Sequence, residues 1–214
     1  MADPLIPTLL PLGDQALLVR FSTELSETAN RAAISLARQL ERETVEGIEE
    51  IAPGLVSGLL RYNSSTDFWR LRGEIMLRMR DDTVQPLGRD HTVGVAFDGK
   101  DVEEVATLLA MTREAFIARH NSSQLRVLAT GFAPGFVYCG FHSADLSVPR
   151  REAVRAMVPA GTVLFAAGQT AIAATPIRSG WHVIGTTRFR NFDPASDPPT
   201  RLRAGDTIRF EADR

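Results

Sequence analysis

Residues 158–174 read Val-Pro-Ala-Gly-Thr-Val-Leu-Phe-Ala-Ala-Gly-Gln-Thr-Ala-Ile-Ala-Ala, and they contain two short apolar runs, Val163–Ala167 and Ile172–Ala174. Runs of this length between Gly and Pro turn residues are typical of buried strands. From Gln124 onward the same pattern recurs in three further runs, at Leu125–Thr130, Trp181–Thr186 and Thr207–Phe210. Many short strands separated by turn signals predict a β-barrel or sandwich for the C-terminal part of the chain.

The N-terminal part combines short apolar runs with helical patterns of apolar residues, and it predicts a small α/β unit in the order β-α-β-β-α. Ser26 is a good N-cap for the first helix, whose residues Ala29, Ala33, Leu36 and Leu40 fall on one face. The expected elements are a strand in Gly13–Phe21, a helix at Ser26–Arg42, strands at Ile48–Ala52 and Leu55–Tyr62, and a helix at Asp67–Met79.

A polar stretch with Pro86 and Gly88 separates the two parts and predicts a linker. We therefore expect an α/β domain at residues 1–82, a linker at 83–90 and a barrel domain at 91–214. The barrel domain begins with a strand at His91–Phe97 and two short helices. Asp101, with Glu104 three residues later, predicts a capping box for the first of them, and Thr112 predicts the cap of the second.

Composition excludes several classes of protein. The 214 residues are 44% apolar and 23% charged, with a formal charge of −2, which argues against a general nucleic-acid or membrane-surface binder. The one lysine, Lys100, follows no Gly-x-x-x-x-Gly-Lys pattern, so no P-loop is expected. No apolar run is long enough for a membrane helix, and the N-terminus is a poor signal peptide, so a cytoplasmic protein is expected.

Histidine and cysteine give no metal-site pattern. The single cysteine, Cys139, lies in an apolar context and is interpreted as structural. The four histidines, at positions 91, 120, 142 and 182, have no metal-ligand spacing, and we interpret them as separate structural or surface residues. No metal is therefore predicted.

The densest candidate is the run Gly131-Phe-Ala-Pro-Gly-Phe-Val-Tyr138, with two glycines, a proline and three aromatic residues. Gly131 and Gly135 allow positive φ, and Pro134 stiffens the turn. Such a loop can present backbone N–H groups to an anion or a carbonyl. The alternative is a barrel corner filled by aromatic side chains, among them Phe132 and Phe136.

Arginines follow this loop. Arg150, Arg151 and Arg155 lie near prolines, a stiff frame that suits recognition of carboxylate or phosphate, although for Arg151 a solvated position is the preferred interpretation. Gln169 and Thr170 offer an amide and a hydroxyl to a polar ligand. Trp181 follows a turn in the stretch Arg178-Ser-Gly-Trp181, and it is expected to be either a pocket wall or a core residue.

The order of these motifs resembles the family that comprises allophanate hydrolase subunit 1, the KipI-like proteins and the B subunit of bacterial 5-oxoprolinase. The resemblance extends over nearly the whole chain and includes Gly13-Asp-Gln-Ala-Leu-Leu-Val and a histidine that matches His120. Its C-terminal motifs are Gly131-Phe-Ala-Pro-Gly-Phe-Val-Tyr, Val148-Pro-Arg-Arg, Val158-Pro-Ala-Gly-Thr-Val, Gly168-Gln-Thr, Gly180-Trp, Ile184-Gly-Thr-Thr, Phe192-Asp-Pro and Arg203-Ala-Gly-Asp-Thr-Ile-Arg-Phe.

The resemblance implies an α+β protein with a small α/β N-terminal domain and a cyclophilin-like β-barrel. It implies a KipA-like (allophanate hydrolase subunit 2) partner, a third TIM-barrel-like subunit in many cases, and ATP with Mg in the assembled complex. The expected activity is the ATP-dependent opening of 5-oxoproline to glutamate. Alternatives are inhibition of a sensor histidine kinase, a carboxyltransferase-type subunit acting on urea- or allophanate-like substrates, and, more weakly, prolyl isomerisation.

The resemblance and the residue types together suggest roles for the candidate residues. Arg150 and Arg155 are expected to contact an anion, and His120 to transfer a proton or hold a loop. The remaining residues are expected to bind substrate: Gly131, Phe132, Pro134, Gly135, Phe136, Gln169, Thr170 and Trp181. The stretch Gln169-Thr-Ala-Ile-Ala-Ala departs from the family's Gln-Thr-Gly-Ile-Tyr-Pro, a change that bears on the substrate rather than on the fold.

Overall fold

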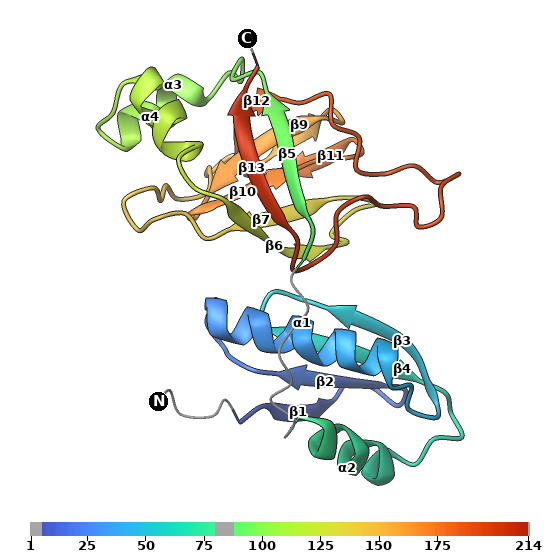
Figure 1. Ribbon diagram of the computed structural model, residues 1–214. Helices are drawn as coiled ribbons and strands as arrows, with labels where there is room; N and C mark the ends of the chain where they lie inside the picture. The colour runs from blue at the N-terminus through green and yellow to red at the C-terminus, as the bar shows by residue number, and fades with distance from the viewer. Residues whose placement is uncertain (1–5, 80–87, 214) are drawn as a thin grey trace. The chain divides into compact units, whose positions relative to one another are not determined.

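The computed structural model describes residues 6–79 and 88–213, and the chain divides into two compact units, residues 1–86 and 87–214 (Figure 1). Residues 83–87 of the predicted linker lie outside the described residues. Each unit has its own hydrophobic core.

The first unit is a four-stranded antiparallel sheet with the order β1-β2-β4-β3 and two helices. The strands β2 and β4 place Leu17, Val19, Leu60 and Tyr62 in the same core as residues of both helices, so the helices cover one face of the sheet. The elements are β1 (Thr8–Pro11), β2 (Ala16–Arg20), α1 (Glu27–Arg42), β3 (Ile48–Pro53), β4 (Ser57–Tyr62) and α2 (Phe68–Arg78).

Both helices of this unit begin where the sequence predicts, because a side chain caps each N-terminus. The Ala29 N–H donates to Ser26 Oγ at 3.3 Å, and the Arg70 N–H donates to Asp67 Oδ1 at 2.7 Å. The sequence did not predict β1, a short edge strand that follows Pro7, ends at Pro11 and pairs with β2 from Thr8↔Arg20 onward.

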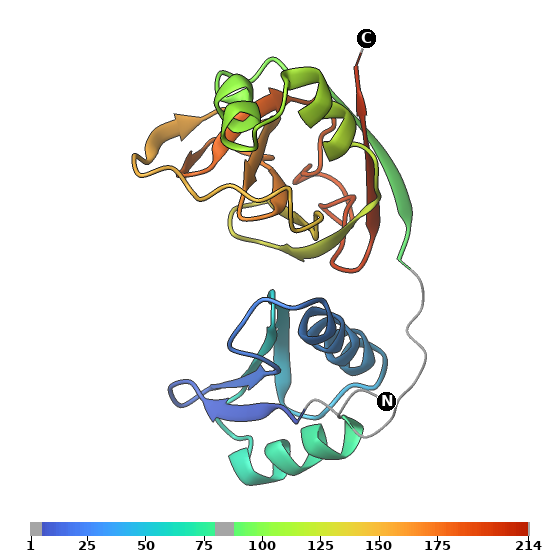
Figure 2. The same cartoon turned by 90° about the vertical axis from the view of Figure 1, so that its left-hand side faces the viewer.

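The second unit is built on a seven-stranded mixed sheet that curls on itself, with the order β12-β9-β10-β7-β6-β13-β5 (Figures 1 and 2). Its elements are β5 (Asp90–Val95), α3 (Val102–Leu108), α4 (Arg113–His120), β6 (Leu125–Thr130), β7 (Val137–Gly140), β8 (Arg155–Val158), β9 (Thr162–Ala166), β10 (Gln169–Ile172), β11 (Ile177–Ser179), β12 (His182–Thr186) and β13 (Thr207–Ala212). The pair β8–β11 forms a separate two-stranded sheet.

The two edges of the curled sheet meet at one isolated bridge. Ala96, directly after β5, donates its N–H to the Thr186 carbonyl at 2.9 Å and accepts the Thr186 N–H at 2.8 Å. The concave side encloses one apolar core, which contains Val95, Phe116, Phe165 and Phe210. A second cluster, with Phe136, Leu164, Ala171 and Trp181, covers the opposite face of β9 and β10.

The strand β10 begins earlier than the predicted run Ile172–Ala174. Ala167 and Gly168 both have positive φ, 51° and 69°, and they form a two-residue turn that pairs Gln169 with Ala166. Gln169 and Thr170 are therefore strand residues.

The capping box predicted for α3 is wrong. Asp101 precedes the helix, but its side chain makes no capping hydrogen bond. Asp101 Oδ2 instead accepts the Val183 N–H at 2.7 Å, while Oδ1 accepts hydrogen bonds from Arg155 and from Arg151. Burial opposes ionisation of this carboxyl, but the Val183 N–H and the two guanidinium groups outweigh it and hold the pKa of Asp101 below its ordinary value.

We predict that Asp101→Ala lowers the free energy of unfolding by about 3 to 5 kcal/mol, because two half-buried guanidinium groups lose their buried counterion. Asp98→Ala is the matched control in the same loop, since among the described residues the exposed Asp98 carboxylate accepts only from the Thr186 hydroxyl. Its expected loss is within about 0.5 kcal/mol. Urea unfolding at pH 7 measures both, and equal losses would contradict the prediction.

Candidate functional site

An aromatic pocket of about 240 Å³ lies on the convex side of the curled sheet, beside β8 and β11. It brings together four of the predicted site residues, Phe132, Phe136, Arg150 and Trp181. Sequence reasoning assigned no ligand role to its other lining residues, which are Tyr138, Arg151, Val154, Ile177, Arg178, Ser179 and Gly180.

Four aromatic rings in a row make the wall of this pocket. Ring centroids are 5.3 Å apart for Phe132 and Phe136, 4.8 Å for Phe136 and Tyr138, and 5.8 Å for Tyr138 and Trp181. The rings meet edge to face, the favoured geometry for aromatic pairs. Trp181 therefore serves both predicted roles, since it is 7% exposed in the second apolar cluster and also lines the pocket.

The pocket is cationic. The Arg150 guanidinium lies 5.8 Å from the centre of the Trp181 ring, in cation–π contact. Neither Arg150 nor Arg178 forms an ion pair within the described ranges, and no acidic side chain lines the pocket. Burial raises the pKa of the Tyr138 hydroxyl, and the nearby Arg150 charge partly opposes this shift. The phenol therefore stays a neutral donor.

Arg151 and Arg155 differ from Arg150 because both are ion-paired. Arg151 Nη1 donates to Asp101 Oδ1 at 3.2 Å and to Glu104 Oε2 at 2.6 Å, so the interpretation of Arg151 as a solvated residue is wrong. Arg155 is ion-paired with the same buried Asp101 and does not line the pocket. Of the predicted anion-binding arginines, the structure places only Arg150 at this pocket.

The loop from Gly131 to Phe136 has the backbone that its glycines predict. Gly131 and Gly135 have φ of 98° and 67°. Gly135 is also tightly enclosed, because a Cβ there would lie 2.4 Å from Phe192 Cβ and 2.8 Å from Ala174 Cβ. The buried Asn191 amide donates to the Gly135 carbonyl at 2.8 Å and accepts the Leu202 N–H, and so fixes the loop to the barrel. Pro134 is exposed at the tip of this loop.

Gln169 and Thr170 do not share a face, because consecutive strand residues point to opposite sides of the sheet. Gln169 lies over Gly140 on the side of Ala171 and Tyr138, and its buried Oε1 has no hydrogen-bond partner among the described residues. Thr170 points into the barrel interior. The structure therefore does not support their predicted joint role in orienting one ligand.

Thr170 lies between two histidines, which contradicts the interpretation of the histidines as separate. His120 Nε2 and His142 Nε2 each lie 2.8 Å from Thr170 Oγ1, and His120 Nδ1 lies 2.7 Å from Asn121 Oδ1. Since Asn121 Oδ1 is an acceptor, His120 carries its proton on Nδ1 and accepts the Thr170 hydroxyl proton at Nε2. His142 then donates from Nε2 to the same hydroxyl.

Both rings of this pair are neutral. Burial lowers the pKa of His120 to about 4, against a smaller opposite effect of Asn121. Burial, followed by the His120 charge, lowers the pKa of His142 to about 3. His120 is fully buried among Phe97, Phe116 and Phe165. It therefore holds the barrel interior together in this structure and does not reach the aromatic pocket.

The described residues also offer no reactive thiol and no metal site. Burial raises the pKa of the Cys139 thiol, which agrees with a structural role. Within residues 6–79 and 88–213, no group of three or more His, Cys, Asp or Glu could hold a metal ion. No helix in these ranges is long and apolar enough to cross a membrane.

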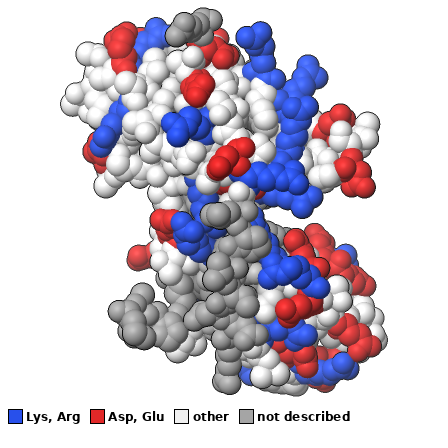
Figure 3. Space-filling model, in the orientation of Figure 1, with Lys and Arg blue, Asp and Glu red and all other residues white. Residues whose placement is uncertain are grey.

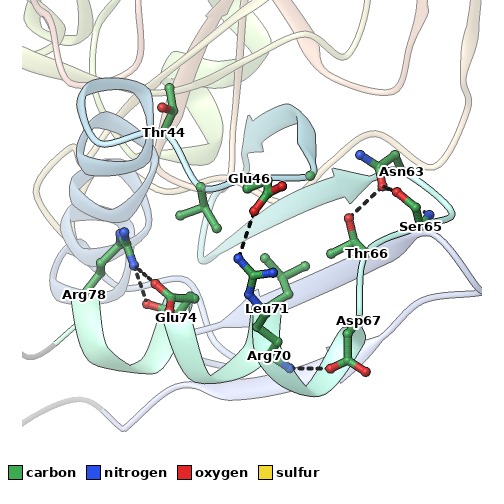
Figure 4. A pocket seen from close by; sticks show the side chains of 12 residues that line it. Thr44, Glu46, Asn63, Ser65, Thr66, Asp67, Arg70, Leu71, Glu74 and Arg78 are labelled. Carbon is green, nitrogen blue, oxygen red and sulfur yellow. Dashed lines mark hydrogen bonds and ion pairs between the residues drawn. The ribbon is translucent and has the colours of Figure 1, made fainter.

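The first unit has a polar pocket at the start of α2, shown in Figure 4, but both of its arginines are ion-paired. Arg70 donates to Glu46 at 2.9 Å, and Arg78 donates to Glu74 at 2.6 Å. Asp67 is the remaining charged side chain, and its carboxylate accepts the Arg70 N–H as the cap of α2. The pocket therefore has no unpaired cation that could select an anion.

Comparisons with known proteins support the sequence resemblance. A family model described as carboxyltransferase domain, subdomain C and D, matches residues 7–202. The B subunit of 5-oxoprolinase from Bacillus subtilis (strain 168) is 31% identical, and the alignment covers 93% of this chain and 90% of that protein.

Two solved structures share the fold. The structure titled TTHA0988 in space group P6522 has a TM-score of 0.83 and 32% identity, and the match covers 94% of this chain but 40% of that one. The Kluyveromyces lactis urea carboxylase has a TM-score of 0.77 and 16% identity, with 97% of this chain and 22% of that chain covered. In both, the fold forms part of a longer polypeptide.

The histidine pair predicts an acid-sensitive barrel. In the unfolded chain both histidines have the ordinary pKa of 6.5, whereas in the folded chain the pKa is about 4 for His120 and about 3 for His142. As pH falls below 6.5, protons therefore bind to the unfolded chain first and stabilise it relative to the folded chain. Between pH 6.5 and 5, the free energy of unfolding should fall by about 1 kcal/mol per pH unit for each histidine. Urea titrations at several pH values measure this slope. His142→Gln should roughly halve the slope of unfolding free energy against pH. An unchanged slope would contradict the conclusion that both histidines are buried and neutral.

The enclosed loop predicts a difference between its two glycines. Gly135→Ala should lower the free energy of unfolding by about 2 to 4 kcal/mol, since the methyl group meets Phe192 and Ala174 in addition to the positive-φ strain. Gly131→Ala carries only the strain, with nothing within 4 Å of its Cβ, and should cost about 1 kcal/mol. Thermal or urea unfolding compares them, and equal costs would show that enclosure is unimportant.

Proposed function

The chain belongs to the carboxyltransferase-domain family, subdomain C and D, and on that premise we propose that it is a non-autonomous subunit of an ATP-dependent amide hydrolase that opens 5-oxoproline to glutamate. The Bacillus subtilis relative is named as a subunit of 5-oxoprolinase, which supports both the subunit role and the hydrolase class. In this proposal the second unit is the family's cyclophilin-like barrel.

The observation that carries the proposal is the aromatic and cationic pocket. 5-Oxoproline is a flat five-membered lactam with one carboxylate. The rings of Phe136, Tyr138 and Trp181 offer an apolar wall to such a ring, and Arg150 offers an unpaired guanidinium to the carboxylate. The absence of acidic lining residues favours an anionic substrate.

The chain's own residues in this proposal bind and orient the lactam. Arg150 holds the carboxylate at the Trp181 face, the Tyr138 hydroxyl is a neutral donor, and the loop fixed by Asn191 keeps Phe132 and Phe136 in place. The cationic side chains at the pocket, Arg150 and Arg178, stabilise negative charge developing on the amide oxygen. ATP supplies the activation that hydrolysis of an unstrained amide requires.

A KipA-like protein, with a TIM-barrel-like third subunit, is the proposed partner. The name of the relative refers to a subunit, and the TTHA0988 structure holds this fold within a chain of which it covers 40%. Both observations support a function that needs further domains.

We predict that co-expression with the KipA-like and TIM-barrel-like proteins yields glutamate from 5-oxoproline only when ATP is present. Arg150→Ala should lower kcat/KM about 10- to 100-fold, the effect of losing a charge-assisted contact to the substrate. Arg72→Ala is the matched control, because that guanidinium also lies over a tryptophan, 5.9 Å from the Trp69 ring centre, but in the first unit. Its kcat/KM should remain unchanged.

Three results separate the alternatives. A stable complex without turnover would point to another amide or to a urea-like substrate. Failure to form any complex would overturn the subunit proposal and favour direct regulation of another protein. Equal changes of kcat/KM in Arg150→Ala and Arg72→Ala would show that the aromatic pocket does not bind the substrate.

A further inference from the structure

A second groove, of about 550 Å³, lies in the barrel unit and takes no part in the proposed substrate pocket. Its lining includes residues of three motifs that the proposed function leaves unused: Ala160-Gly161, Thr187 and Phe192. Its lining residues are Ala160, Gly161, Ala174, Thr187, Arg188, Phe189, Arg190 and Phe192. Its volume lies within the range of small-molecule sites.

The groove has two positively charged side chains that are not ion-paired with any described residue. Arg188 and Arg190 line it, both are exposed, and neither forms an ion pair with any described residue. No acidic side chain is among the described residues that line it. Asp193, the next carboxylate along the chain, accepts the Ala195 N–H and the Ser196 hydroxyl within its own turn. Figure 3 shows Lys and Arg side chains gathered along one margin of the barrel unit, beside the segment between β12 and β13.

The backbone that carries the two arginines is fixed. The Thr187 N–H donates to the Gly161 carbonyl at 2.8 Å, and its hydroxyl donates to the Gly94 carbonyl at 2.6 Å while accepting the Phe189 N–H. Gly161 has φ of 82°, and a Cβ there would lie 2.7 Å from the Thr187 carbonyl oxygen. The groove therefore has a rigid floor, and only the arginine side chains need to be ordered when a ligand binds.

The same groove adjoins the loop of the aromatic pocket. Phe192 and Ala174, which line the groove, are the residues that enclose Gly135 from the other side. Phe189 packs against the barrel core and has the Arg201 guanidinium 6.0 Å from its ring centre. Aromatic and arginine groups thus lie together at this edge of the loop.

We propose that this groove binds the polyphosphate group of a phosphate-bearing small molecule. Two unpaired guanidinium groups can form bidentate hydrogen bonds to several phosphate oxygens, whereas a single carboxylate offers one charge to both. The Phe192 ring and the alanines give the remainder of such a molecule, for example a nucleoside, an apolar surface. This inference concerns binding by the isolated chain and does not depend on the proposed hydrolase activity.

Isothermal titration calorimetry on the purified full chain tests the inference with sodium pyrophosphate and ATP as probes. Saturable one-to-one binding that weakens as NaCl rises from about 50 to about 300 mM is expected for a site of this charge, on the order of the salt effects seen for phosphate contacts. Tighter binding of ATP than of pyrophosphate would assign a nucleoside to the groove. Equal affinity would assign the polyphosphate group alone, and sodium glutamate should bind at least about tenfold more weakly than either.

The paired variant Arg188→Gln/Arg190→Gln should weaken pyrophosphate binding at least about tenfold. The matched control is Arg70→Gln/Arg72→Gln, which removes two exposed arginines at the same spacing from the first unit and should change the affinity less than about twofold. Absence of saturable binding to the unmodified chain, or equal weakening in both variants, would overturn the proposal. Thermal unfolding of each variant confirms that the fold is retained.

Discussion

The two hydrogen bonds between Ala96 and Thr186 join the edges of the seven-stranded sheet, and the candidate sites depend on that closure. A flat sheet of these strands would expose both faces to water. Closure gives β9, β10 and β7 a concave side without solvent and a convex side on which short segments can pack. Asp101 strengthens the junction, because its carboxylate connects the start of α3 to β12 and to the arginines near β8.

The two sides carry different chemistry, and the alternation of side chains along β10 separates them. On the concave side, Thr170 satisfies two buried histidines that remain uncharged. The convex side places Ala171 under the aromatic row, so the pocket wall rests on the sheet through a small residue. The two neighbouring arginines differ in ion pairing. Arg151 is paired with Asp101 and Glu104, whereas Arg150 has no acidic partner among the described residues and lies over the Trp181 ring.

Local features of the structure were predictable from the sequence, and long-range ones were not. Ser26 and Thr112 cap helices as predicted, because a cap depends on residues three positions apart. The loop glycines have the positive φ that their surroundings suggested. The role of Asp101 was missed because its partners lie 50 to 82 residues away, where no local pattern indicates them. The histidine pair was missed for the same reason, since Thr170, which contacts both rings, comes later in the chain.

The position of β13 has a consequence for synthesis. This last strand lies between β5, its parallel neighbour, and β6, and its register with β5 begins at Thr207↔Asp90. The Arg89 N–H likewise donates to Asp206 across 117 residues. Until β13 leaves the ribosome, β5 and β6 have no strand between them, and the interior remains open to water. The barrel therefore closes only after β13 has emerged, and the nascent chain must protect a half-built apolar interior until then.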